Sequence, residues 1–272
     1  MTTRTTTGKT ADTADGRGAA ALRALHVPGR PLVLPNVWDA ASARAVEAAG
    51  FPVVATGSDA VAAALGYDDG EWTPAGEMLA AIARISRAVA LPVTADVERG
   101  YGLEPAELVA RLAEAGAAGC NLEDSDPRTG EMIDVAEQAA FLGAVRAAAD
   151  DAGLDLVINA RVDTYMNGSG DSGERLTESV RRGRRYLEAG ADCVYPIMAT
   201  EPETISALAE GIGGPVNVLF RPGMPSLEEL AELGVARVSF GPGLHRAALA
   251  HTGLLLSAIR DGRDPFEPVA AS

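Results

Sequence analysis

Lysine, histidine and cysteine are scarce in this sequence of 272 residues, and each shortage argues against a class of chemistry. Lys9 is the only lysine and lies in a Thr-rich start that we expect to be disordered, so neither a Schiff-base lysine nor a lysine-anchored cofactor is expected. The three histidines stand apart from the acidic motifs, which disfavours a zinc site. Cys120 and Cys193 lie in apolar runs typical of buried strands, so we expect free thiols rather than a disulfide.

Long apolar runs are also absent. No stretch of about 18 uncharged apolar residues occurs, and the start, MTTRTTTGKTADTADGRG, lacks the apolar core of a signal peptide. The 23 basic and 38 acidic residues give a net charge of −15, which disfavours nucleic acid and anionic membranes as partners. We therefore expect a cytoplasmic protein whose anionic substrate is met by local positive groups or by a metal ion.

A repeating pattern follows residues 1–20, which we predict to be a disordered tail. Short apolar runs alternate eight times with longer helix-patterned stretches, and several helices end in Ala-Gly or Leu-Gly before the next run. The predicted strands are 32–35, 53–56, 93–96, 119–123, 156–161, 193–196, 216–219 and 237–240. The predicted helices are 40–49, 74–89, 105–115, 135–152, 175–189, 202–209, 226–233 and 244–260.

This alternation predicts one α/β domain over residues 21–272, a closed (β/α)₈ TIM barrel. Its strands are continuous apolar runs, as expected where helices cover a parallel sheet, and eight units in about 240 residues match the usual size of such a barrel. An open, doubly wound sheet is the alternative. In a barrel the active site lies at the carboxyl ends of the strands, so the residues that end each run are the candidate site.

Three carboxylates converge at these ends. Asp96 and Glu98 follow the third predicted strand and Glu123 ends the fourth, which gives an oxygen-only site of the kind that Mg²⁺ prefers. The alternative is a structural role, in which Asp96 and Glu98 cap the next helix or pair with Arg99. We interpret the cluster as a metal site.

Other strand ends supply candidates for substrate binding. Arg161 ends the apolar run LVINAR and suits a clamp for a carboxylate or phosphonate, although an ion pair with Glu123 or Asp163 is the alternative. The turn after the second strand offers backbone amides and hydroxyl groups that could hold a carboxylate. It consists of Thr56, Gly57 and Ser58. Tyr195 and Asn217 are further polar residues at the ends of predicted strands.

Five local motifs resemble the isocitrate lyase/phosphoenolpyruvate mutase superfamily over about residues 32–250. They are TGS at 56–58, LGYDDGE at 65–71, ADVERGYG at 95–102, NLEDS at 121–125 and NARVD at 159–163. The pair ADVERGYG and LEDS at this spacing is the specific part of the resemblance.

The resemblance implies a barrel whose last helix is swapped between subunits, in a homotetramer built as a dimer of dimers. It implies Mg²⁺, with Mn²⁺ as a possible substitute, held by Asp96, with Glu98 and Glu123 acting directly or through water and Asp69 nearby. Arg161 and the 56–58 turn would bind a small carboxylate. The chemistry shared by the superfamily is the formation or quenching of the enolate of a 2-oxo acid.

The loop after the fourth strand departs from the family pattern. Isocitrate and methylisocitrate lyases carry a cysteine general acid there, and the mutases a lysine and an asparagine, whereas residues 125–134 read SDPRTGEMID. Glu131 in this loop, or Tyr195 across the barrel mouth, is our candidate for the missing proton donor. Arg128 is a poorer acid because it stays charged.

We therefore predict a Mg²⁺-dependent lyase that cleaves a carbon-carbon bond of a small 2-hydroxy di- or tricarboxylate. The alternatives are a carbon-phosphorus mutase or hydrolase of the phosphonopyruvate type, a hydrolase of an oxaloacetate-like compound, and a homologue that binds a 2-oxo acid without catalysis. Retention of the three carboxylates and Arg161 favours an enzyme.

Overall fold

Parallel strands form the centre of the molecule, in a computed structural model that describes residues 17–266. The strands are β1 (Leu32–Leu34), β2 (Asn36–Val37), β3 (Val54–Thr56), β4 (Val93–Asp96), β5 (Gly119–Leu122), β6 (Val157–Val162), β7 (Cys193–Pro196), β8 (Asn217–Leu219) and β9 (Arg237–Ser239). They follow the order β2-β3-β4-β5-β6-β7 in one sheet and β1-β9-β8 in another. All eight predicted strands are confirmed.

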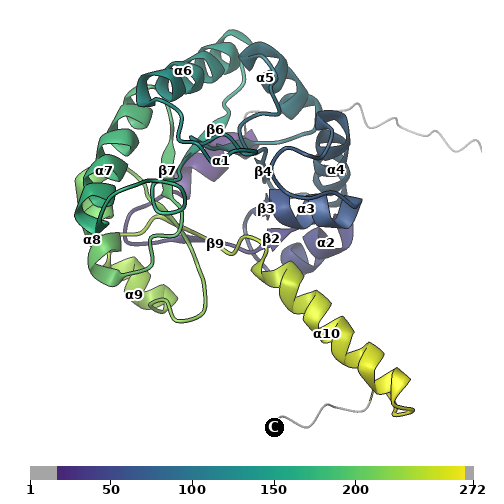
Figure 1. The fold of residues 1–272 in the computed structure, drawn as a ribbon. Helices are drawn as coiled ribbons and strands as arrows, with labels where there is room; N and C mark the ends of the chain where they lie inside the picture. The colour runs from purple at the N-terminus through teal and green to yellow at the C-terminus, as the bar shows by residue number, and fades with distance from the viewer. Residues whose placement is uncertain (1–16, 267–272) are drawn as a thin grey trace, which may run out of the picture.

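The two sheets join into a closed barrel. Pro35 separates β1 from β2, and the two act as one strand, since β1 pairs with β9 and β2 with β3. Proline has no N–H to donate, which explains the interruption of the ladder there. A parallel bridge between Val194 and Val216 links β7 to the β8 side, and Figure 1 shows the resulting ring. The prediction of a (β/α)₈ barrel is confirmed.

Helices surround the ring (Figure 1). They are α1 (Arg17–Ala24), α2 (Ala40–Ala48), α3 (Ser58–Leu65), α4 (Ala75–Ala88), α5 (Pro105–Glu114), α6 (Val135–Asp151), α7 (Ser172–Glu188), α8 (Pro202–Ile212), α9 (Leu227–Glu232) and α10 (Gly243–Arg260). The eight predicted helices are present, and α1 and α3 were not predicted. Helix α1 begins inside the stretch predicted as a tail, while residues 1–16 lie outside the described part of the chain.

Helix α1 packs against the barrel interior. Its Leu22 is fully buried and belongs to one apolar cluster with Leu34, Val53 and Val157. Gly119 allows the close approach, because a Cβ there would lie 2.7 Å from the carbonyl oxygen of Val157 and 3.0 Å from Leu22 Cδ2. The amino end of the barrel is thus closed by side chains from α1.

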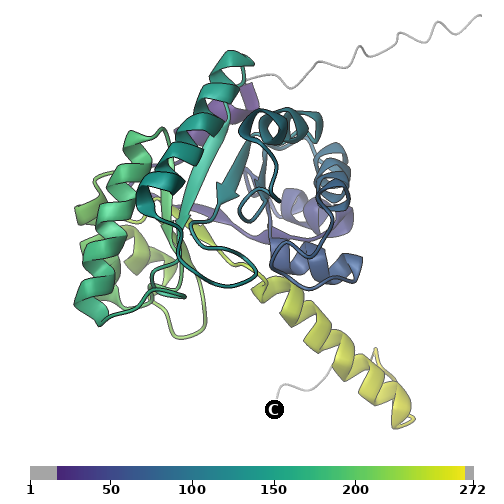
Figure 2. The same ribbon diagram turned by 45° about the horizontal axis from the view of Figure 1, so that its top comes forward.

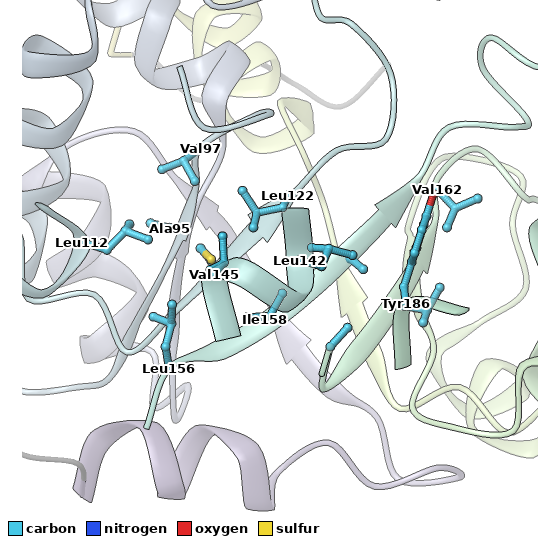
Figure 3. Close-up of a cluster of buried hydrophobic side chains, with 14 of the residues drawn as sticks. Ala95, Val97, Leu112, Leu122, Leu142, Val145, Leu156, Ile158, Val162 and Tyr186 are labelled. Carbon is cyan, nitrogen blue, oxygen red and sulfur yellow. The ribbon is translucent and has the colours of Figure 1, made fainter. Parts of the chain in front are cut away.

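The core outside the barrel lies between the strands and the helices that flank them. Figure 3 shows Leu122 and Ile158 of the strands facing Leu142 and Val145 of α6. All four side chains are fully buried. Burial of apolar side chains on the outer face of the strands therefore anchors the ring of helices, while polar side chains occupy much of the interior.

Helix α10 extends away from the barrel in both views (Figures 1 and 2). Its outer part exposes apolar side chains, with Leu249 at 56%, Leu254 at 56%, Leu256 at 60% and Ile259 at 58% exposure. Such a patch marks an interaction surface. Exchange of this helix between subunits remains a prediction. Among residues 17–266, no helix has both the length and the apolar composition needed to cross a membrane.

Candidate active site

Two adjoining pockets open at the carboxyl ends of the strands. The larger has a volume of about 480 Å³ and includes Asp96 in its wall, and the smaller, of about 190 Å³, includes Glu98 and Glu123. Asp69 and Arg161 line both. A third hollow of about 850 Å³ lies beside them, between α8 and the segment that follows β8, and contains none of the predicted site residues. The two adjoining pockets are the candidate active site.

Asp96 ends β4 and is held by the turn that begins α3. The backbone N–H of Asp96 donates to Thr56 Oγ1 at 2.8 Å, and the N–H of Ser58 donates to Asp96 Oδ2 at 3.1 Å. Asp96 Oδ1 is buried and has no hydrogen-bond partner within residues 17–266. Gly57 caps α3, so the positive end of this helix faces the carboxylate. One oxygen of Asp96 is therefore available to a ligand.

Glu98 is 2% exposed, and both of its carboxylate oxygens are engaged. The hydroxyl of Tyr101 donates to Oε1 at 2.7 Å, and the backbone N–H of Glu71 donates to Oε2 at 2.7 Å. Burial, followed by the negative charge of Asp69, raises the pKa of Glu98 to about 7. A cation in the pocket would favour its ionised form.

Left-handed backbone is concentrated beside this carboxylate. Glu71, Glu98 and Tyr101 have φ values of 57°, 48° and 56°, which is uncommon for residues other than glycine. Their hydrogen bonds hold them together, since Glu71 Oε1 also accepts the N–H of Tyr101 at 2.6 Å. Backbone strain of this kind is concentrated at functional sites. Here it brings the 66–73 and 98–102 segments together over the smaller pocket.

Arg161 forms ion pairs with two buried carboxylates. Its Nη1 donates to Glu123 Oε1, and its Nε donates to Asp163 Oδ1 at 2.6 Å. Burial raises the pKa of Glu123 well above its usual value, and the charge of Arg161 opposes this effect. The structural ion pair weighed as an alternative is thus present. Arg161 nevertheless lines both pockets and so also remains placed to meet a ligand.

A second buried network lies directly behind Glu123 and was not predicted. Asp124 is fully buried and accepts hydrogen bonds from the hydroxyl of Tyr186 at 2.8 Å and from Arg182 Nη1 at 3.0 Å. It also accepts the N–H of Asp163 at 2.8 Å. Burial and then the charge of Asp163 raise the pKa of Asp124 to about 6. Asp124 was visible in the LEDS motif, but its partners on α7 gave no signal in the sequence.

Of the remaining predicted site residues, two line the pockets and two do not. Asp69 lies at the exposed pocket rim, where partial burial and then the charge of Asp96 raise its pKa. Tyr195 is 5% exposed and lines the larger pocket. By contrast, Glu131 is exposed and does not line either pocket. Asn217 is fully buried at the start of β8, inside the barrel and below the pocket.

Apolar side chains make up one wall of the larger pocket and were not predicted. They come from the last residue of β8 and from the segments after β6, β7, β8 and β9, and include Met166, Ile197, Met198, Leu219, Phe220 and Phe240. Arg221 and Arg246 stand among them. Side chains beyond the last strand residue are hard to place from sequence, because loop geometry decides whether they turn into the pocket.

The loop of residues 125–134 packs against the 66–73 segment. The guanidinium carbon of Arg128 lies 4.7 Å from the centre of the Trp72 ring, and Arg128 Nη2 donates to the carbonyl oxygen of Glu71 at 3.2 Å. Gly70 is required at the contact, since a Cβ there would lie 2.8 Å from the carbonyl oxygen of Pro127. The loop therefore covers the smaller pocket.

The oxygen-rich donor set fits a hard divalent cation. Within residues 17–266, no three His, Cys, Asp or Glu side chains are grouped closely enough to hold one metal ion directly. Asp96 Oδ1 is free, whereas the oxygens of Glu98 accept other hydrogen bonds. This arrangement fits Mg²⁺ bound through one direct carboxylate oxygen and several waters, the coordination that Mg²⁺ usually adopts in proteins.

Comparison with known proteins places the chain in one family. The family model described as phosphoenolpyruvate phosphomutase matches residues 22–260. A protein from Burkholderia cenocepacia J2315, assigned as a phosphonomutase, is 46% identical, with a TM-score of 0.86 over 89% of this chain and 99% of its own. The structure of a 2,3-dimethylmalate lyase is 27% identical, with a TM-score of 0.79 over 93% and 91%. An oxaloacetate decarboxylase from Bradyrhizobium sp. strain ORS 278 is 31% identical over 90% of this chain and 86% of the relative.

Proposed function

The chain belongs to the phosphoenolpyruvate mutase/isocitrate lyase superfamily, and on this basis we propose that it is a Mg²⁺-dependent lyase acting on a small 2-hydroxy di- or tricarboxylate. The reaction would break the carbon-carbon bond beside the hydroxyl-bearing carbon, leave a 2-oxo acid and pass the electron pair to an enolate-type anion of the second product. The buried, unpartnered Oδ1 of Asp96, next to Glu98 and the Glu123–Arg161 pair, carries the proposal.

Asp96 would hold the cation directly, with Glu98 and Glu123 acting through water. When bound, Mg²⁺ supplies a Lewis acid that stabilises developing negative charge on substrate oxygens. Glu98 and Glu123 are almost fully buried, and their raised pKa values reflect how costly it is to charge them without a cation. Metal binding and ionisation of these carboxylates should therefore be coupled.

The turn at the start of α3 would hold the carboxylate of the 2-oxo acid unit. Gly57 and Ser58 line the larger pocket, where the helix amino end favours an anion. Arg161 would contribute its positive charge from the opposite side. Because Glu123 and Asp163 already pair with it, Arg161 is fixed in place before substrate arrives. Glu123 would take the hydroxyl proton.

Tyr195 is our proposed proton donor. Burial raises its pKa to about 12, so it is protonated at any working pH, and its side chain lines the pocket. Glu131, the other candidate, has an exposed side chain outside both pockets. Geometry decides between candidate acids before pKa does, and it favours Tyr195.

Decarboxylation of oxaloacetate is the second candidate reaction. Its support is the loop of residues 125–134, which has no Cys, His or Lys to protonate a departing carbanion. Loss of CO₂ leaves a pyruvate enolate, which takes a proton at its methylene carbon from water after CO₂ has left, so the loop need not supply an acid for the leaving group. The relative named oxaloacetate decarboxylase points the same way, while the neighbour assigned as a phosphonomutase keeps carbon-phosphorus chemistry as a third reaction to test.

Product release from a substrate panel tests these reactions. We would measure 2-oxo acid formation, with Mg²⁺ and with chelator, from 2,3-dimethylmalate, 2-methylisocitrate, isocitrate, citramalate, oxaloacetate and phosphonopyruvate. Asp96→Ala removes the free oxygen, and Asp39→Asn is the matched control, since Asp39 caps α2 at the same end of the barrel but lies outside both pockets. Mg²⁺-dependent product from a malate-type acid, lost only in Asp96→Ala, supports the lyase. Product from oxaloacetate or phosphonopyruvate alone selects the corresponding alternative. Mg²⁺-dependent binding without product would identify a non-catalytic homologue.

Self-association through α10 is part of the proposal. The helix leaves the barrel and exposes a row of apolar side chains, which exchange between two subunits would bury. We propose a homotetramer built as a dimer of dimers. Sedimentation of the wild type and of the double variant Leu254→Glu, Leu256→Glu tests it, and a wild type that sediments as a monomer at micromolar concentration would contradict it.

A further inference from the structure

Arg237 is buried inside the barrel with no acid to pair with it. It opens β9, is 1% exposed and stands in register with Asn217 of β8. Its Nη2 donates to Asn121 Oδ1 at 3.2 Å, its Nη1 lies 3.4 Å from His26 Nε2, and its Nε has no partner. Among residues 17–266, no carboxylate lies within ion-pair distance of the guanidinium. Arg237 is thus a buried, unneutralised positive charge.

The contacts of Arg237 leave this charge in place. His26 Nδ1 lies 2.9 Å from the carbonyl oxygen of Leu22, which requires the proton on Nδ1 and leaves Nε2 as an acceptor for Arg237. Burial, followed by the charge of Arg237, lowers the pKa of His26 to about 4, so the imidazole is neutral at physiological pH. Asn121 is neutral as well. An arginine does not give up its proton in a protein.

Stability does not explain this arrangement. Charges buried without a partner are costly, and replacing buried charged groups by well-packed apolar side chains of similar volume is often neutral or stabilising. Leu32, which stands in register with Arg237, is apolar and belongs to a buried apolar cluster, so the barrel can accept such side chains at this level. The retained charge therefore suggests a role in function.

The guanidinium lies one residue layer below the candidate active site. Asn121, which it contacts, stands in register with Asp96 on β4. Glu123 follows Asn121 by two positions and so projects on the same face, about 7 Å further along the strand. Asp96 is close enough for its negative charge to act on Arg237. The arginine thus lies beneath the pocket without lining it.

Few positive side chains of the pocket are both buried and free of an acid partner. Arg246 pairs with Asp59, and both Arg246 and Arg221 are exposed to solvent where they line the larger pocket. Asp69, Asp96, Glu98 and Glu123 line the two cavities, and Arg161 is already paired with Glu123 and Asp163. Arg161 can orient a carboxylate substrate, but the two acids offset much of its positive charge. A charge without an acid partner, in an interior of low dielectric constant, acts over several ångströms.

We propose that Arg237 is an electrostatic positioning residue, which acts from the barrel floor on the anionic substrate and on the enolate-type anion formed from it without touching either. The inference rests on the proposed function, because it requires an anionic ligand in the pocket. Two unit charges roughly 8 Å apart at an effective dielectric constant of about 20 correspond to about a 30-fold effect on binding or rate. The effect should grow with the negative charge of the ligand.

Substitutions of Arg237 that remove or keep its positive charge test the proposed role. Arg237→Met and Arg237→Gln remove the charge, and Arg237→Lys keeps it. Cys193→Ala is the matched control, because Cys193 is a neutral, fully buried residue whose strand position is in register with Asn159, itself hydrogen-bonded to Asn121. Two quantities are measured for each variant: kcat and KM with the substrate found in the panel, and the Mg²⁺-dependent affinity for oxalate, a dianion that resembles the enolate of pyruvate. Unfolding midpoints show whether each variant is folded.

We expect Arg237→Met and Arg237→Gln to lose at least about 30-fold in oxalate affinity and in kcat/KM, without a lower unfolding midpoint for Arg237→Met. Arg237→Lys and Cys193→Ala should stay within about threefold of the wild type, since a retained charge and a neutral change should both be tolerated. The proposal is overturned if folded Arg237→Gln binds oxalate as well as the wild type, or if Cys193→Ala loses as much as Arg237→Gln.

The oxalate measurement separates this inference from the proposed function. A wild type that binds oxalate with Mg²⁺ but turns over nothing in the panel still decides the role of Arg237 through its variants. A wild type that binds oxalate and whose variants are unchanged refutes the inference and leaves the proposed function standing. A wild type that neither binds oxalate nor yields product refutes the proposed function, and the inference falls with it.

Discussion

Acid should destabilise this fold through one histidine. His26 follows α1, is 7% exposed and donates from Nδ1 to the carbonyl oxygen of Leu22. Burial and the nearby charge of Arg237 lower its pKa to about 4, whereas a histidine in an unfolded chain has a pKa of about 6.5. At intermediate pH the unfolded chain therefore binds a proton that the folded chain does not.

The sign and size of the effect follow from linkage. The stability due to neutral His26 is fully present above about pH 6.5 and is lost as the pH falls from there towards about 4. A difference of about 2.5 pKa units corresponds to about 3 kcal/mol in total, of which about 2 kcal/mol is already lost at about pH 5. For a domain of ordinary stability this is a large fraction of the free energy of unfolding.

Urea unfolding at about pH 8 and about pH 5 measures this loss directly. His26→Gln is the comparison, because an amide can replace both hydrogen bonds but does not titrate. The wild type should lose about 2 kcal/mol more than His26→Gln between the two pH values, while other titrating groups contribute equally to both proteins. Equal losses in the wild type and in His26→Gln would refute the reasoning, since the protonation of His26 would then not oppose folding.

Three further substitutions probe the site and the barrel. Asp96→Asn should abolish Mg²⁺-dependent turnover, by roughly 100-fold or more, and weaken Mg²⁺ binding, which calorimetry with Mg²⁺ alone measures. Tyr195→Phe should lower kcat by roughly 100-fold or more with little change in KM, whereas Glu131→Gln should change kcat less than about twofold. Steady-state kinetics of both variants measures this, and a larger loss in Glu131→Gln would identify Glu131 as the acid. Leu22→Ala should lower the free energy of unfolding in urea by roughly 2–5 kcal/mol, because loss of the fully buried Leu22 side chain opens a cavity at the amino end of the barrel. A loss below about 1 kcal/mol would mean that α1 does not close this end.

The fold could be predicted because its signals are local. Each strand is a short apolar run, and glycines such as Gly116 and Gly190 adopt the left-handed conformation between a helix and the next strand. Helix α3 was missed because it starts directly at Ser58, with no polar side-chain cap, inside a segment interpreted as a turn. Helix α1 was missed because its packing under the barrel depends on Gly119 and Val157, which are distant in sequence.

Most residues of the candidate site could be predicted from the sequence, but the hydrogen bonds and ion pairs between them could not. Parallel strands bring Asp96, Glu98, Glu123 and Arg161 to one edge whatever the details of the loops. The sequence does not show that Glu98 adopts a φ of 48°, which turns its carboxylate towards two donors. One donor, Tyr101, lies three residues away and reaches Glu98 only because of this backbone turn, and the other, Glu71, lies 27 residues away. A single sequence carries no pattern for either contact.

Asn217 shows why the position of a polar residue along its strand matters as much as its type. The run that contains it was predicted as 216–219, with Asn217 taken as a polar strand end, whereas β8 begins at Asn217 and ends at Leu219. Since every second residue of a strand faces the interior, Asn217 and Leu219 point the same way, but only Leu219 reaches the pocket. Arg237 begins β9 at the same level. Polar residues that open a strand, such as Asn217 and Arg237, thus form a layer beneath the site and do not line the pocket.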